Sequence, residues 1–227
     1  MGRQSMTPLI PRVPRNAALL NALLVLIVVA PLIPMERYWF LVELIFDAIL
    51  LAGVYSVGPG KNRWPFLVLT VLTFGTRWGE LFSGYRALDV GALAITVVWL
   101  VYAVSIIIAH LFRSRDVTVD TIMGAIVPYL LVAIAFAFSF EIIEIQSPGS
   151  FSGLPEDVLV DRPELGNAMI YFSLVCITTM GYGDIVPVSS LARPFVVMEG
   201  VFGQLYLAVM IARLVGLHLV SERQPDD

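Results

Sequence analysis

The sequence contains a single cysteine, Cys176, and two histidines, His110 and His218, among its 227 residues. One cysteine cannot form an intrachain disulfide, and it cannot build a cysteine-based metal cluster within one chain. Charged residues are also scarce, at 14% of the chain, against roughly 25% in soluble domains. The net charge of −4 provides no basic surface for nucleic acid. We therefore expect no nucleic-acid partner and no cofactor. Since no residues are paired for catalysis in the polar segments, we also expect no enzyme.

Hydrophobic residues make up 58% of the chain, which is too many for a soluble domain. A membrane-spanning helix needs about 20 mostly apolar residues. Segments of this length predict an all-α membrane protein with six transmembrane helices, at about 17–34, 38–57, 65–84, 90–112, 122–145 and 193–220. The first run is longer than the apolar part of a typical signal peptide, so it is predicted to be a retained helix.

Basic residues outside the spans favour one orientation of these helices. Cytoplasmic segments of membrane proteins carry an excess of Lys and Arg, and one side holds eight of these residues against four on the other. Both termini fall on the richer side and are therefore predicted to be cytoplasmic. The eight are Arg3, Arg12, Arg15, Lys61, Arg63, Arg113, Arg115 and Arg223, and the four are Arg37, Arg86, Arg162 and Arg193.

A segment of another kind lies between the fifth and sixth predicted spans. Residues 146–165 are polar and rich in Pro and Gly, which is typical of a loop. Residues 166–178 are apolar but too short to cross, a length that suits a re-entrant helix. The outer stretch 141–164 holds six acids and one arginine. It is either a solvated loop or a negative mouth that concentrates cations.

The re-entrant helix leads into residues 178–184, which have the sequence TTMGYGD. Non-helical backbone at membrane depth occurs only where protein buries it or where it lines a water-filled path. Gly181 and Gly183 allow backbone angles that a side chain would forbid, so successive carbonyls can point toward one axis. Rings of such carbonyls replace the hydration shell of a cation. Thr179 adds a hydroxyl oxygen, and the partly negative end of the preceding helix also favours a cation.

TTMGYGD resembles the selectivity-filter signature of the tetrameric potassium channel family. The order of outer helix, pore helix, filter and inner helix over about 118–220 is similar to that family as well. The resemblance implies a homotetramer, in which three identical subunits complete the pore within membrane lipids. It also implies potassium ions as the permeant ligand, coordinated at Thr179, Met180, Gly181 and Tyr182. The implied filter residues are Thr179, Met180, Gly181, Tyr182 and Gly183, and the implied supporting residues are Thr178, Asp184 and Tyr171.

The segment departs from the family pattern in two places. Met180 stands where the family usually has valine, and Val175 stands where it often has an acidic partner for the filter. The Met180 carbonyl can still face the ion, but its long, flexible side chain must point back toward the pore helix, where Val175 and Cys176 leave space. The resemblance places an aromatic pair that braces the filter at Tyr171 and Phe172.

Three functions are compatible with this sequence. The first is a potassium-selective channel that conducts passively. The second is a weakly selective monovalent cation channel, because of Met180. The third is a non-conducting membrane sensor or assembly subunit that keeps the pore fold. Resemblance to compact bacterial six-helix channels further implies a prokaryotic cytoplasmic (plasma) membrane.

The inner helix, 193–220, carries Gly203 where the family commonly has its gating glycine. Glycine weakens a helix, so Gly203 is either a hinge or a site of close helix packing. Gln204, Leu207 and Ile211 share one face, which the register of the family places on the central cavity. Gln204 would then be its polar wall, while Leu207 and Ile211 would form an apolar gate.

Charged residues also fall inside the predicted spans. Glu43 and Asp47 share one face of the second helix, and Arg77 and Glu80 share one face of the third. Because charges within a membrane usually pair, these residues form either a clamp between the helices or a ligand or proton site.

The predicted architecture is that of a voltage-gated-like channel without the arginine-rich sensor helix. Its parts are a cytoplasmic segment 1–16, a four-helix sensor-like domain 17–112, a linker 113–121, a pore domain 122–220 with pore helix 166–178 and filter 179–183, and a cytoplasmic tail 221–227. In the inner helix, Glu199 is expected to bond behind the filter. Arg213 is expected to face a neighbouring subunit or a lipid headgroup near the gate.

The fourth predicted helix has no Lys or Arg between Asp89 and Arg113. Moving one charge through 100 mV is worth about 2.3 kcal/mol, so steep voltage gating needs several charges. We predict an open probability that changes little with voltage. Single-channel recordings in planar bilayers check this, and a slope equivalent to several gating charges would contradict it.

Overall fold

The computed structural model describes residues 15–33, 35–57, 63–83, 86–114, 118–155, 158–159 and 162–222. Side chains are described throughout these ranges except at 15, 35–39, 80–83, 86–89, 162 and 218–222. The predicted segment 1–16, the middle of the linker 113–121 and the tail 221–227 therefore lie largely outside the described residues.

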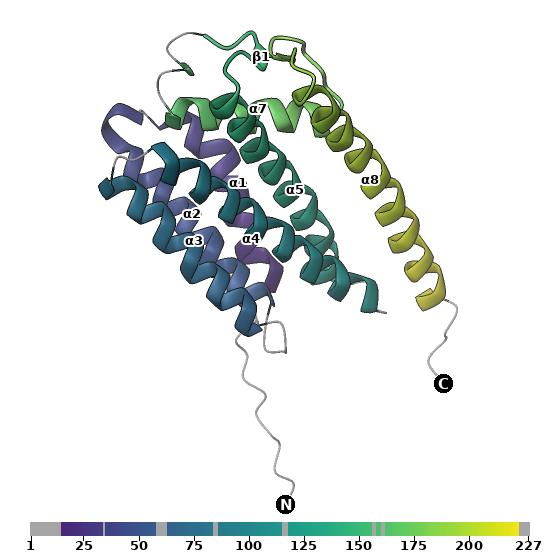
Figure 1. The fold of residues 1–227 in the computed structure, drawn as a ribbon. Helices are drawn as coiled ribbons and strands as arrows, with labels where there is room; N and C mark the ends of the chain where they lie inside the picture. Colours follow the sequence, from purple (N-terminus) through teal and green to yellow (C-terminus); the bar gives the residue numbers. More distant parts are fainter. Residues whose placement is uncertain are drawn as a thin grey trace, which may run out of the picture.

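Helices dominate the described chain (Figure 1). The helices are α1 (Arg15–Val29), the 3-10 turn η1 (Ala30–Leu32), α2 (Met35–Val57), α3 (Arg63–Ser83), α4 (Arg86–Arg113), α5 (Val119–Gln146), α7 (Arg162–Ile177) and α8 (Ala192–Glu222). Two short strands, β1 (Phe151–Ser152) and β2 (Val186–Pro187), pair antiparallel.

Four helices are long and apolar enough to cross a membrane, with spans at Phe40–Val57, Val90–Arg113, Val119–Gln146 and Ala192–Leu217. The predicted spans at 17–34 and 65–84 do not reach this mark within the described residues. The first is interrupted because α1 ends at Val29 and a 3-10 turn containing Pro31 follows. In α3, threonines at 70, 73 and 76 and the charged Arg77 interrupt the apolar sequence.

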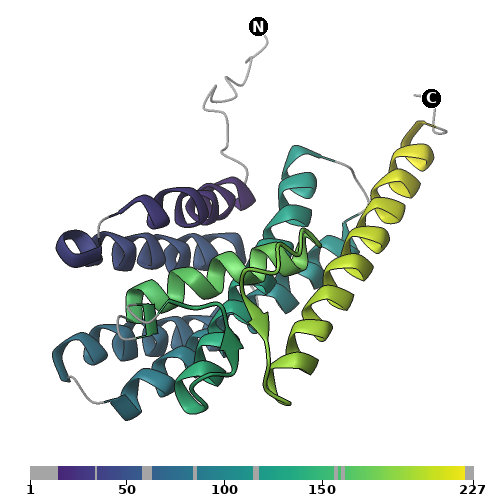
Figure 2. The same cartoon turned by 90° about the horizontal axis from the view of Figure 1, so that it is seen from above.

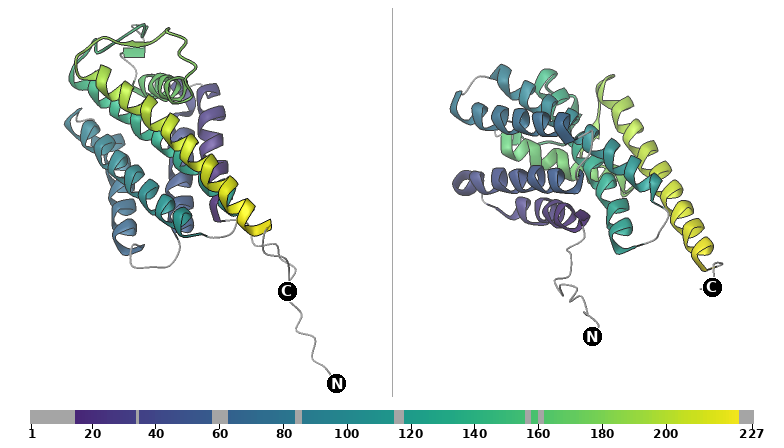
Figure 3. Two further views of the ribbon diagram at one scale, coloured as in Figure 1. Left: turned by 90° about the vertical axis from the view of Figure 1, so that its right-hand side faces the viewer. Right: turned by 90° about the horizontal axis from the view of Figure 1, so that it is seen from below.

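Helix α5 lies at the centre of the molecule and contacts α1, α4, α7 and α8. Within its span, 67% of the residues are buried, against 22% for the span of α8. Helices α1 to α4 gather on one side of α5, and α8 lies at the opposite edge with much of its surface uncovered (Figures 1 and 2). Figure 3 shows α7 at the end of the molecule opposite to the last turns of α8.

The side of α5 that faces α1 to α4 is closed by a continuous apolar core. Large side chains from each helix meet there, among them Leu23, Phe46, Phe66, Trp99 and Leu131. The indole of Trp99 is fully buried and donates to the Thr70 hydroxyl at 2.8 Å. Buried polar groups need such partners because leaving them unpaired costs about 1–3 kcal/mol. This core holds α3 against α4, and α4 against the central helix α5.

The loop between α5 and α7 is held in place by one carboxylate and by an aromatic cluster. Glu144, at the end of α5, accepts hydrogen bonds from the backbone N–H of Gly149 (2.6 Å) and of Phe151 (3.0 Å). Phe151 in β1 packs against Phe140 and Phe172, with ring centroids 5.4 to 5.5 Å apart. The loop therefore forms a fixed cover on α7.

Candidate ion pathway

Helix α7 ends in a turn whose carbonyls are capped by the residues that follow it. Its 16 residues begin at Arg162, four positions before the predicted start. The backbone N–H of Thr179 donates to the Cys176 carbonyl (2.9 Å), and the N–H of Met180 donates to the Val175 carbonyl (3.0 Å). The Thr178 hydroxyl donates to the Leu174 carbonyl at 2.6 Å. These bonds satisfy the last carbonyls of the helix, which have no helical partner of their own, and they fix where the extended segment begins.

The backbone of 179–183 alternates between two conformations. Thr179, Gly181 and Gly183 have φ of 61°, 54° and 75°, whereas Met180 and Tyr182 are not among the positive-φ residues. In an ordinary strand, successive carbonyls point to opposite sides. Because every second residue here has a positive φ, successive carbonyls can instead point to the same side. A Cβ at Gly181 or Gly183 would meet no atom within 4 Å. Glycine is therefore required here by the backbone angle rather than by space.

The two side chains between these positions lie away from their own chain. Met180 is 55% exposed and Tyr182 is 67% exposed. The sequence placed the Met180 side chain against Val175 and Cys176. In one chain the Met180 backbone N–H donates to the Val175 carbonyl at 3.0 Å, while the side chain is more than half exposed. The packing of this side chain therefore stays a prediction.

Asp184 follows the last glycine and is held by α7. The Tyr171 hydroxyl donates to Asp184 Oδ2 at 2.6 Å, and this hydrogen bond lowers the pKa of the Asp184 carboxyl. Gly153 of the outer loop has φ +93°, and a Cβ there would overlap the Asp184 carbonyl oxygen. Phe172, the other member of the expected aromatic pair, packs in the cluster with Phe140 and Phe151.

The C-terminus of α7 is clamped by two other helices. The Tyr129 hydroxyl of α5 donates to the Ile177 carbonyl at 2.8 Å. On the other side, a Cβ at Gly203 of α8 would come within 2.7 Å of both the carbonyl oxygen and Cγ1 of Ile177. Gly203 therefore lets α8 approach the end of α7 closely, which favours the packing interpretation of this glycine over the hinge.

The residues expected to line the cavity point away from their own chain. Gln204, Leu207 and Ile211 are exposed along α8, with Leu207 at 39% and Ile211 at 60%. Tyr206, between them, turns inward and donates to the Ala125 carbonyl of α5 at 2.6 Å. The face of α8 that carries the predicted wall and gate is thus uncovered by its own subunit.

Arg213 lies farther along α8 and contacts the end of α4. Its Nη2 donates to the carbonyls of Leu111 (2.6 Å) and Ser114 (2.8 Å), and its guanidinium lies 4.8 Å from the centre of the Phe112 ring. Cations stabilise helix C-termini in this way. Nη2 of Arg213 is therefore bound within its own chain, and the expectation that this residue also faces a neighbouring subunit or a lipid headgroup stays a prediction.

The intramembrane charges pair between α2 and α3. Arg77 donates to Glu43 Oε2 through Nη2 (2.6 Å) and Nε (3.1 Å), and it lies 4.3 Å from the centre of the Phe46 ring. The Trp78 indole donates to Asp47 at 3.2 Å. These contacts favour the clamp over a ligand or proton site. The side chain of Glu80 lies outside the described residues.

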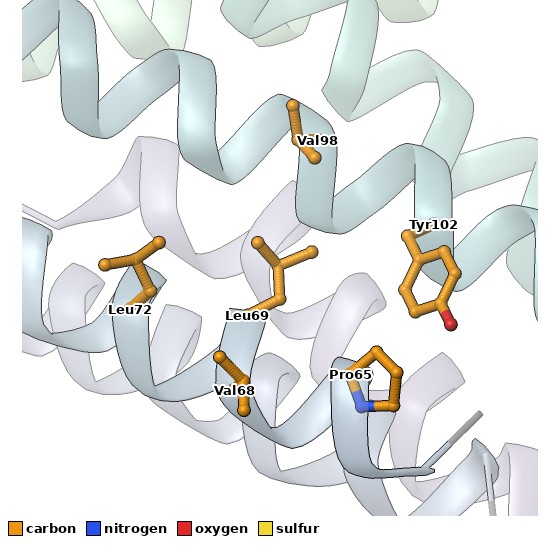
Figure 4. A pocket seen from close by; sticks show the side chains of 6 residues that line it. All are labelled: Pro65, Val68, Leu69, Leu72, Val98 and Tyr102. Carbon is orange, nitrogen blue, oxygen red and sulfur yellow. The ribbon is translucent and has the colours of Figure 1, made fainter. Parts of the chain in front are cut away.

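A groove of about 470 Å³ lies between α3 and α4, away from residues 178–184 (Figure 4). Its lining is almost wholly apolar and consists of Pro65, Val68, Leu69, Leu72, Val98 and Tyr102. A surface of this kind offers no ligands to an ion, so the groove is separate from the candidate ion path.

Comparison with known proteins locates the relationship in the C-terminal part of the chain. Residues 129–217 match a family model described as an ion channel. This part of the chain is similar to the ion channel family that the model describes. Protein LctB of Bacillus caldotenax is similar, with 24% identity over 102 residues that cover 45% of this chain and 75% of LctB. No solved structure matches the chain.

The match to an ion channel model and the four apolar helices support an integral membrane protein with a role in ion transport. At that level they agree with the prediction from the sequence. Two polar side chains that join α5 to α7, Tyr129 and Ser173, were missed from the sequence. The signal was available, because a polar residue inside an apolar membrane helix must find a partner.

The Tyr171–Asp184 contact generates a prediction for Tyr171→Phe. The hydrogen bond to ionised Asp184 holds above the lowered pKa of this carboxyl and is lost as pH falls through it. Removing the hydroxyl raises this pKa toward its ordinary value. We expect ion flux to fall when Asp184 becomes protonated, and we expect this fall to begin at a higher external pH in Tyr171→Phe. Flux from proteoliposomes over an external pH series measures this. Tyr55→Phe, at an exposed tyrosine of α2, is the control. Superimposable acid limbs for Tyr171→Phe and the native protein would contradict it.

Proposed function

We propose that this chain is the subunit of a homotetrameric potassium channel, which conducts K⁺ passively through a filter formed by residues 179–183. The alternating backbone at Thr179, Gly181 and Gly183 carries the proposal. It gives a short segment whose carbonyls can face one side, directly after a capped helix end. Carbonyl oxygens arranged in rings replace the water around a dehydrated K⁺ ion.

The assembly into four subunits is supported by what one chain leaves uncovered. One filter segment supplies a single wall of a pore, and its Met180 and Tyr182 side chains are more than half exposed. Four copies around one axis would complete the carbonyl rings and cover these side chains. The apolar face of α8, including Leu205 and Ile211 at 61% and 60% exposure, would then line the cavity or contact neighbouring subunits and lipid.

The remaining parts of the proposal concern the membrane and the gate. In it, six helices span the cytoplasmic membrane of a prokaryote, namely α1 to α5 and α8, with both termini on the cytoplasmic side. Gln204 forms the polar wall of the cavity, and Leu207 and Ile211 form an apolar constriction below it. Gating is not steeply voltage-dependent, because the only described arginine in the interior of the first four helices, Arg77, is paired with Glu43.

A weakly selective cation channel is the second candidate, and Met180 favours it. Valine is stiff because its side chain branches at Cβ, whereas methionine is flexible. A filter with a mobile side chain behind one carbonyl ring would hold its geometry less tightly. A non-conducting membrane sensor or assembly subunit is the remaining candidate. Any measured ion flux through the purified protein would exclude it.

Reconstitution into liposomes separates these candidates. We expect the purified protein to take up K⁺, to exclude Na⁺, and to be blocked by Ba²⁺ from one side. Equal K⁺ and Na⁺ uptake would instead identify a weakly selective channel. No uptake of either ion, from protein that elutes as a stable tetramer, would identify a non-conducting subunit.

Met180→Val tests the effect of the side chain on the filter. We expect K⁺ flux to persist and the ratio of K⁺ to Na⁺ uptake to rise or stay equal, because the branched side chain restricts the backbone behind the ring. Met198→Val, at an exposed position of α8, is the matched control. Loss of K⁺ flux in Met180→Val alone would show that methionine fills a site that valine cannot.

A further inference from the structure

Glu199 of α8 and Ser173 of α7 are both fully buried behind the filter. The Ser173 hydroxyl oxygen lies 2.6 Å from the Ala133 carbonyl oxygen of α5 and is also hydrogen-bonded to Glu199 Oε1. These three groups join the outer, pore and inner helices of the ion channel domain at one point. Ser173 stands four residues before Ile177, where α7 ends.

The hydrogen count at Ser173 restricts the state of Glu199. A serine hydroxyl carries one hydrogen, and a backbone carbonyl only accepts. If the Ser173 hydrogen points at Ala133, the contact between Ser173 and Glu199 lacks a hydrogen unless the carboxyl supplies it. A protonated Glu199 completes both bonds in a single direction, from Glu199 to Ser173 and from Ser173 to Ala133.

The surroundings of Glu199 point to the same state. In the described part of the chain the ion pair is between Arg77 and Glu43, and no basic side chain hydrogen-bonds to Glu199. Glu199 Oε2 is buried and has no hydrogen-bond partner among the described residues. The titratable groups that face it are Tyr129 of α5 and Cys176 of α7, both ordinarily neutral. A buried carboxylate without a cation or N–H donors is strongly disfavoured.

Glu144 provides the contrast within the same domain. It is 2% exposed, and its two oxygens accept from the backbone N–H groups of Gly149 and Phe151. Glu199 has no such N–H donors among the described residues. Because Glu199 is enclosed by its own chain, a neighbouring subunit cannot supply the missing donors.

We propose that Glu199 is a protonated carboxylic acid that positions the pore helix, by donating its hydrogen to Ser173. The chain Glu199–Ser173–Ala133 then sets the place of α7 and of the filter that follows it. Glu199 acts through hydrogen bonding and adds no charge near the ion path. The consequence for conduction rests on the proposed channel function, whereas the protonation state does not.

Infrared spectroscopy of the full-length protein in lipid tests the protonation state directly. We expect a carbonyl band of a protonated carboxylic acid at neutral pH that shifts in D₂O. The band should disappear in Glu199→Gln and persist in the matched control Glu144→Gln. A native spectrum without that band, or a band that survives in Glu199→Gln, overturns the proposal.

Potassium flux tests the positioning role. Glutamine is neutral and keeps an N–H donor, so we expect Glu199→Gln to retain flux within about twofold of the native protein. Glu199→Ala removes the donor, and we expect flux to fall by about tenfold or more, the usual scale of a lost buried hydrogen bond. Equal losses in the two variants, from protein of native size and thermal stability, overturn the role. If Glu199→Ala does not fold, Ser173→Ala, which removes the middle of the same chain, takes its place.

Failure of this inference and failure of the channel assignment are distinguishable. If the native protein conducts no ions but shows the carboxylic acid band, the channel function fails and the protonated Glu199 stands. If the native protein conducts K⁺ without the band, the reverse holds.

Discussion

The close packing at the C-terminus of α7 is the constraint on which the ion channel domain depends. The carbonyl of Ile177 accepts from Tyr129, and the backbone of α8 approaches it so closely that only glycine fits at position 203. Protein interiors transmit small displacements because they are close-packed. The starting point and direction of residues 178–184 are therefore set by three helices together, not by α7 alone.

The segment 179–183 that follows α7 is held at both ends by contacts with its own chain. At the inner end, amides of 179–181 cap the carbonyls of α7. At the outer end, Tyr171 holds Asp184, and the outer loop reaches the backbone of the same residue at Gly153. Between these ends, the side chains of Met180 and Tyr182 are more than half exposed. Such a segment suits a surface that other copies complete, because the geometry is preset before the subunits meet.

Helices α1 and α4 are joined to α5 and α8 by polar contacts as well as by the apolar core. Arg213 of α8 binds the last carbonyls of α4, and Asn16 of α1 bonds to Asp120 at the start of α5 (3.0 Å from its backbone N–H to Oδ1). Any movement of the part of α8 around Arg213 must therefore either break these hydrogen bonds or move the end of α4 with it. The bundle α1 to α4 has no Lys or Arg between Asp89 and Arg113 of its fourth helix, but these contacts still couple it mechanically to α8.

The sequence by itself determined the membrane class, the order of the pore elements and the position of the segment TTMGYGD. These features depend on apolar length and on local residue order, which are properties of the chain in one dimension. It was less successful with α1 and α3, since a proline and several polar residues interrupt runs that are apolar on average. The tertiary structure alone decided which faces meet: Phe172 with Phe140, Arg213 with the end of α4, Gly203 with Ile177, and Glu199 with Ser173. Each of these pairs joins residues distant in sequence, and its partner depends on how the helices rotate and cross when they pack.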